Sequence, residues 1–192
     1  MPCLVMHLAV AKEYLKKNTG ENEEEFLLGT IAPDINMPDI NKYINGVGVD
    51  KNSYHFGDNY SVVDTIDAIQ YMKRKVNFAK FFACNDLSTS FLRAYFLHLI
   101  CDCLFFGEYV TSEDLEGLTA DEARTKGYAD YNRITPKLIE KYDLIVPDVI
   151  KSIIFGNSEG ELEILKEDRI YKFIEDMSKI DINDFKNNIL KI

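Results

Sequence analysis

The segment at residues 91–106, FLRAYFLHLICDCLFF, is almost wholly apolar and constrains the fold of this chain more than any other feature. A helix over these residues has no clear polar face, so it is expected to lie at the centre of the protein. His98 and Asp102 interrupt the run four positions apart, a spacing that places both on one helical face, about 5–6 Å apart at Cβ. A buried, unpaired carboxylate costs several kcal/mol, so Asp102 needs a cation or hydrogen-bond donors.

Two interpretations of this pair stay open. A metal ion would satisfy both residues, because neutral imidazole nitrogen and carboxylate oxygen are common ligands. A buried hydrogen bond between His98 and Asp102 would also satisfy them, because polar pairs with this spacing arise by chance. Arg93 and Glu108 interrupt the apolar run as well, so it falls short of the roughly 20 apolar residues of a membrane-spanning helix, and we expect no integral membrane segment.

Helical periodicity dominates the remainder of the chain. Apolar residues at positions 4, 8, 11 and 15 predict an amphipathic helix over about residues 3–17. Further helices are predicted over EEEFLLG and over residues 64–76, 88–106, 130–142 (or only from Pro136), 147–155, 168–179 and 181–190. Residues 30–60 are expected to be irregular, 111–127 to mix helix and turn, and 161–165 are ambiguous. The prediction is an all-α, multi-helix bundle forming one domain over residues 1–192.

The formal net charge is −10, and the longest basic cluster is the KRK at positions 73–75. Because phosphate contacts supply much of the affinity for nucleic acid, binding to duplex nucleic acid is disfavoured. The apolar N-terminal stretch has no preceding basic residues and is interrupted by His7, so no secretory signal is predicted and a cytoplasmic location is expected. The four cysteines lack CxxC spacing, which favours reduced thiols over a disulfide framework.

Three further residues have both a plain and a functional interpretation. His55 stands in NSYHFGDN, within the long irregular segment, and His7 borders the apolar stripe of the first helix. Taken singly, each of these histidines is more often a surface or core residue than a ligand. Asp34 ends the stretch LLGTIAPD, where Pro33 disfavours helix at the preceding residue, so Asp34 is predicted to lie in a turn.

The ordered set of these motifs resembles a known family. A first helix with His7 is followed by GTIAPD ending in Asp34, by YHF with His55, and by HLICD with His98 and Asp102. This order is similar to that of the zinc-dependent phospholipase C superfamily, which includes the single-strand-specific zinc nucleases of fungi and plants. The resemblance covers the motifs of about the first 110 residues and uses all three histidines of the chain. It implies an all-α fold with a metal cluster between core helices.

The resemblance also implies a set of ligands. Asp34, His55, His98 and Asp102 would hold one metal, and Asp102 would bridge to a second. That second metal would also take His7 and the N-terminal amine, which would belong to Pro2 if the initiator methionine is removed. A third site of the family uses a histidine where this chain has Glu108, and its later histidine motif is missing.

Glu108 and Asp130 are therefore the candidate carboxylates for a third site, with a surface glutamate and a helix cap as their plain interpretations. Two or three ions are expected, with zinc as the first candidate. Iron or manganese are alternatives, because carboxylate ligands favour them more than an all-histidine set does.

The function that follows is a metal-dependent phosphoric-ester hydrolase, similar to phospholipase C, in which Asp34 is the catalytic residue that orients or deprotonates water. Its substrate would be a small phosphoester or a lipid headgroup. One alternative is a metal-binding or structural helical protein without catalysis. Another is an acidic helical adaptor without metal, which a direct bond between His98 and Asp102 would favour.

Overall fold

The computed structural model describes residues 3–35, 54–57, 68–72, 76–145 and 159–189. Over these ranges the chain is all-α, with two isolated β-bridges and no strand, which confirms the predicted fold class. The α-helices are α1 (Leu4–Lys17), α2 (Glu23–Ile35), α5 (Ala68–Met72), α6 (Phe78–Cys84), α7 (Ser90–Leu104), α8 (Ala120–Tyr142), α10 (Glu167–Met177) and α11 (Ile182–Ile189). A π-helical turn (Phe105–Tyr109) follows α7, and a 3-10 turn (Glu113–Leu115) precedes α8.

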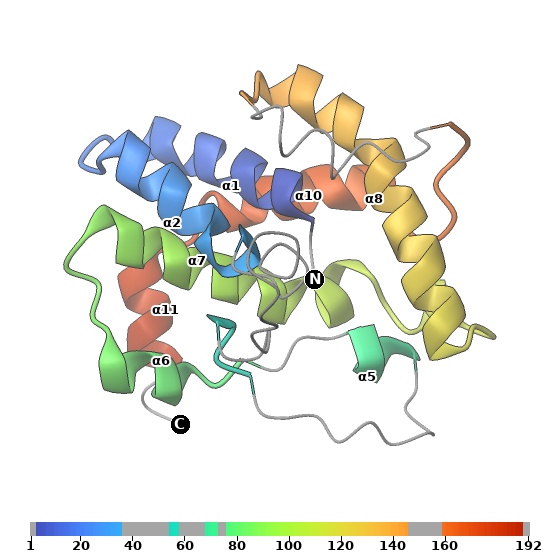
Figure 1. The fold of residues 1–192 in the computed structure, drawn as a ribbon, viewed down its shortest axis with the longest axis horizontal. Helices are drawn as coiled ribbons and strands as arrows, with labels where there is room; N and C mark the ends of the chain where they lie inside the picture. The colour runs from blue at the N-terminus through green and yellow to red at the C-terminus, as the bar shows by residue number, and fades with distance from the viewer. Residues whose placement is uncertain (1–2, 36–53, 58–67, 73–75, 146–158, 190–192) are drawn as a thin grey trace, which may run out of the picture.

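Helix α7 crosses the middle of the molecule, as the apolar segment predicts. Figure 1 shows α1 and α2 along one side of it and α6 and α11 along the other. The segment Ser90–Tyr109 is long and apolar enough to cross a membrane, with a mean hydropathy of 1.3, but 61% of it is buried inside the fold. Burial of this kind is typical of a core helix, so the described residues contain no clear integral membrane segment.

Helices α2 and α7 run in the same direction and approach each other closely. At their starts, the backbone N–H of Asn22 donates a hydrogen bond of 2.9 Å to the hydroxyl of Ser90. Further along, Gly29 faces the backbone of Phe91, and a Cβ added at Gly29 would lie 2.2 Å from the Phe91 carbonyl oxygen. Only glycine permits this approach, which brings the C-terminal half of α2 against the polar residues of α7.

The prediction that Pro33 ends the helix and leaves Asp34 in a turn is wrong. Helix α2 continues through Pro33 to Ile35, and Asp34 lies in its last turn. A proline in a helix removes one backbone hydrogen bond and costs about 3 kcal/mol or more. The burial of one face of α2 in the core, including Phe26 and Thr30, offsets this cost. Asp34 is thereby fixed by a helix and not by an irregular segment.

The predicted start of the 130–142 helix is also wrong. Helix α8 begins at Ala120, because Thr119 and Glu122 form a capping box in which each side chain bonds the other's backbone N–H. The helix then passes through Pro136 without a break.

The other predicted helices agree with the structure to different degrees. Helices α1, α10 and α11 match their predicted ranges within a few residues. Helix α7 gives way to the π-helical turn, where Gly107 has a φ of 111°, at the predicted stop. Within the predicted 64–76 helix only α5 is described as helical, and Val76 forms a bridge instead. Residues 161–165 form neither helix nor strand, the 147–155 helix lies outside the described residues, and α6 was not predicted.

Candidate metal centre

Five of the seven side chains predicted as metal ligands converge in the core, and each is at most 2% exposed to solvent. Four of them come from helices that pack together and one comes from a short turn at residues 54–57. They are His7 on α1, Asp34 on α2, His55 in the turn, and His98 and Asp102 on α7. The motifs that follow one another along the sequence thus meet in a single cluster in the fold.

The Asp102 carboxylate lies close to all three histidines. Its Oδ1 atom lies 3.3 Å from Nε2 of His7. Its Oδ2 atom lies 3.5 Å from Nε2 of His55 and 3.8 Å from Nε2 of His98. The two carboxylate oxygens of Asp102 therefore approach different histidines, Oδ1 approaching His7 and Oδ2 approaching His55 and His98.

Asp34 approaches the cluster from the end of α2. Its Oδ1 atom lies 3.3 Å from Nε2 of His55, so His55 Nε2 is in contact with a carboxylate oxygen of Asp34 and with one of Asp102. The two aspartates come from different helices, and the turn that carries His55 lies between them.

The His98 ring is oriented by the backbone of α2. Its Nδ1 atom lies 2.8 Å from the Thr30 carbonyl oxygen, and because a carbonyl only accepts, Nδ1 carries the proton and donates. Burial, followed by the nearby His7, lowers the pKa of His98 to about 3, so the ring is neutral at physiological pH. Its Nε2 lone pair then faces the cluster, in the manner of metal-ligating histidines whose other nitrogen donates to a carbonyl.

The electrostatics of Asp102 favour the ionised form that a ligand needs. Burial works to raise the pKa of this carboxyl, but the surrounding histidines, His98 first, outweigh it and hold the pKa well below its usual value. A neutral imidazole at His98 and an ionised carboxylate at Asp102 are the protonation states in which these two groups bind metal.

The surroundings of the His7 ring indicate whether a metal would fit the cluster. Its ring stacks on that of His98 with the centroids 3.8 Å apart, and the side chain is 1% exposed. Neither ring nitrogen of His7 has hydrogen-bond geometry to a described residue, although Nε2 is in contact with Asp102. A buried polar atom left unsatisfied costs about 1–3 kcal/mol, and an ion beside Nε2 would remove that cost.

Two overlapping sets of side chains offer ligand atoms that all lie within 4.8 Å of one another. One set is His7, Asp34 and His98, and the other is His55, His98 and Asp102. Because bonds from zinc to nitrogen or oxygen are about 2.0–2.2 Å long, ligand atoms around one tetrahedral ion lie roughly 3.4 Å apart. The ligand atoms of each set lie close enough together for these buried groups to hold a metal ion.

The direct hydrogen bond between His98 and Asp102 that one metal-free interpretation requires is not present, although His98 Nε2 lies 3.3 Å from His55 Nε2. His98 Nε2 and Asp102 Oδ2 are 3.8 Å apart, beyond hydrogen-bond distance, and the ring N–H of His98 donates to Thr30 instead. A direct bond between His98 and Asp102 would have favoured the adaptor hypothesis, and this structure does not contain it.

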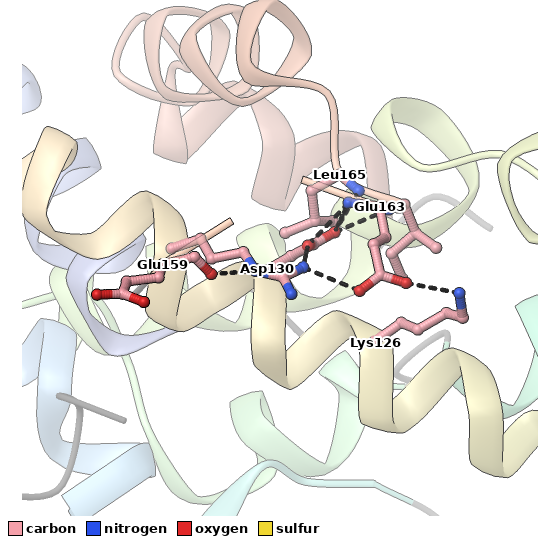
Figure 2. Close-up of polar contacts among 7 residues, drawn as sticks. Lys126, Asp130, Glu159, Glu163 and Leu165 are labelled. Atoms are coloured by element: carbon pink, nitrogen blue, oxygen red, sulfur yellow. Dashed lines mark hydrogen bonds and ion pairs between the residues drawn. The ribbon is translucent and has the colours of Figure 1, made fainter. Parts of the chain in front are cut away.

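The structure does not bring Asp130 into the cluster. Its carboxylate, 0% exposed, accepts the backbone N–H groups of three successive residues at 2.8–3.0 Å, and also pairs with Arg133 at 3.0 Å. Figure 2 shows this contact between α8 and the 163–165 segment that precedes α10. A carboxylate that accepts so many hydrogen bonds has a structural role, because it joins α8 to the 163–165 segment. The prediction that Asp130 is a metal ligand of the cluster is therefore corrected.

Glu108 also lies outside the cluster. It is exposed in the π-helical turn after α7, and neither of the two potential metal-binding groups includes it. The two carboxylates predicted for a third site therefore occupy separate positions, and the candidate centre consists of the five clustered residues.

The residues that support the ligands carry no motif that the sequence alone reveals. The Thr30 carbonyl is one example, and the spacing of Thr30 and Asp34, at i and i+4, could have placed both on one helical face had α2 been predicted at its full length. The hydroxyl of Tyr95, which donates to the carbonyl of Tyr54 beside His55, is a second example. A contact between residues so far apart in sequence leaves no local signal.

Comparison of the chain with protein-family models, with curated proteins and with solved structures found no match in any of the three. The fold and the cluster together define an all-α protein with buried histidine and aspartate groups that can hold metal.

Proposed function

We propose that the protein is a metal-dependent phosphoric-ester hydrolase related to the zinc-dependent phospholipase C superfamily. The observation that carries the proposal is the position of Asp102, whose two carboxylate oxygens face different histidines in a buried cluster. Paired ions about 3.5–4 Å apart, bridged by such a group, are characteristic of enzymes that cleave phosphate esters. The ordered sequence motifs supply the second support.

The clustered residues divide between two ions in this proposal. Asp34, His55 and His98 would bind the first ion together with Asp102, and His7 would bind the second on the other oxygen of Asp102. Zinc suits the nitrogen and oxygen donors, and iron or manganese are alternatives for a set rich in carboxylate. When bound, the ions would supply positive charge that stabilises a phosphoryl group during attack by water.

Asp34 has the role of general base in the proposed reaction. Its carboxylate comes from the last turn of α2 and lies against His55. A carboxylate in this position would accept a proton from the attacking water and hold that water toward the phosphorus, which typically contributes 10²–10⁴-fold to the rate.

The proposed substrate is a small phosphoester or an exposed lipid headgroup, and the proposed location is the cytoplasm. The net charge of −10 disfavours long polyanions as substrates. The four cysteines, all within the described residues, form no disulfide, which fits a reducing compartment.

A second candidate function is a structural metal site without catalysis. The observation that favours it is burial, since all five clustered side chains are at most 2% exposed. Structural metal sites have a closed set of protein ligands, whereas catalytic sites leave a position for water or substrate.

Turnover of phosphate esters by metal-replete protein separates the two functions. We expect hydrolysis of a small phosphodiester or phosphomonoester, faster than cleavage of single-stranded nucleic acid. The Glu108→Gln variant serves as a matched control, because it removes an exposed carboxylate outside the cluster and should retain full activity. Metal-replete protein that cleaves none of these esters would favour the structural site, and faster cleavage of nucleic acid would contradict the substrate assignment.

A further inference from the structure

His55 differs from the other clustered residues in how the fold holds it. His7, Asp34, His98 and Asp102 are fixed by helices that pack on one another. His55 instead lies in a turn within the short segment 54–57, after the helical residue Tyr54 and before Gly57, which forms a bridge with Val76. We refer to residues 54–57 as the His55 turn. A ligand on a turn needs anchors of its own, because ligand atoms must hold their positions within about 0.5 Å for a productive site.

Hydrogen bonds fix the backbone on both sides of His55. The carbonyl of Tyr54 accepts a hydrogen bond from the hydroxyl of Tyr95. The carbonyl of Phe56 accepts one of 2.8 Å from the backbone N–H of Asn77, at the start of α6. The Tyr54–His55 peptide group is thus bonded to α7, and the Phe56–Gly57 peptide group is bonded to the N-terminus of α6.

The residue after His55 has an unusual backbone conformation. Phe56 has a φ of 52°, in the left-handed region that bulky side chains rarely adopt, at a cost on the order of 1–3 kcal/mol. Its ring packs edge-on against Phe81 and Tyr95, with centroid distances of 5.2 and 6.1 Å. The conformation allows Phe56 to pack against these rings while the neighbouring His55 reaches the metal cluster.

Tyr95 holds the His55 turn in two ways, by a hydrogen bond to the Tyr54 carbonyl and by packing against the Phe56 ring. It lies three residues before His98 on the same helix. One rigid element therefore carries the ligand His98 and the hydroxyl that holds the His55 turn. The two ring nitrogens, His98 Nε2 and His55 Nε2, are 3.3 Å apart, close to the spacing of two ligand atoms on one ion.

We infer that Tyr95 is a positioning residue, whose hydroxyl sets the place of His55 in the metal centre by holding the Tyr54 carbonyl. The inference rests on the metal centre of the proposed function and is independent of hydrolysis. Residues that orient metal ligands through hydrogen bonds typically contribute 10–100-fold to metal affinity. The Tyr95 hydroxyl would act in this way, through the backbone of the His55 turn.

The test measures metal affinity of the full-length chain after its metal has been stripped, by titration with Zn²⁺ and with Co²⁺. Tyr95→Phe keeps the ring stacked on Phe81 and removes only the hydroxyl. We expect about 10–100-fold weaker Zn²⁺ binding and an altered absorption spectrum of the Co²⁺-saturated protein. The matched control is Tyr171→Phe, which removes a hydroxyl that donates to Glu167 on α10, and it should match the wild type in both readouts.

The outcomes separate this inference from the proposed function. Equal Zn²⁺ affinity in Tyr95→Phe and wild type would overturn the inference, and so would equal losses in Tyr95→Phe and Tyr171→Phe. A wild-type chain that binds no metal would overturn the metal centre itself and with it this role. In a His55→Ala background, Tyr95→Phe should weaken binding no further, because the hydroxyl acts through His55, and an additional loss of similar size would contradict that route.

Discussion

Replacing Asp102 by asparagine is expected to release more metal, and to destabilise the protein more, than replacing His7 by alanine. Asp102 contacts histidines with both carboxylate oxygens, whereas His7 contacts only one of those oxygens. A metal present at 1,000 times its Kd stabilises a fold by about 4 kcal/mol, so losing two ions costs more than losing one. Elemental analysis and thermal unfolding of the two variants measure the difference.

Asp130→Asn provides the control for a buried carboxylate outside the centre. Asp130 is as buried as Asp102, but its partners are Arg133 and the backbone of residues 163–165. This variant should lose about 1–3 kcal/mol of stability with its metal content unchanged. Equal metal content in Asp102→Asn and His7→Ala would show that Asp102 does not bridge two ions.

The second large effect is expected from Asp34→Asn, which should lower the rate of ester hydrolysis by about 10²–10⁴-fold while metal remains bound. The amide keeps the shape of the side chain and an oxygen toward His55, but it cannot accept a proton from water. Measurement of kcat on a small phosphoester, together with the metal content of the same sample, separates loss of the base from loss of the metal.

Two results would count against this role of Asp34. Activity close to that of the wild type in metal-replete Asp34→Asn would assign the proton transfer to another group. Loss of metal in step with activity would make Asp34 a ligand only, without a part in moving the proton.

The pairing of His98 with Asp102 could be predicted from their helical spacing, whereas their grouping with His7, Asp34 and His55 was implied only by the resemblance of the ordered motifs to a known family. His98 and Asp102 are one turn apart in an apolar helix, and His7 borders an apolar stripe, so each has a local signal of burial. The bundle was predictable as well, because periodic apolar positions define α1, α10 and α11 and a continuous apolar run defines α7.

What the sequence could not predict depends on contacts between distant segments. Pro33 predicts the end of a helix, yet α2 continues to Ile35. The close packing of Gly29 against Phe91 holds α2 in place against α7. Asp130 is of a residue type that commonly binds metal. Its carboxylate is instead satisfied by backbone N–H groups of residues 163–165, a contact between segments far apart in the sequence. The anchors of the His55 turn likewise come from other parts of the chain.

The most direct test of the metal centre is the metal content of freshly purified wild-type protein that has never met a chelator or a nickel resin. The five buried side chains at the cluster should retain transition metal through purification, and with Asp102 as a bridge the expected content is about two ions per chain. Less than one ion per chain would contradict the account.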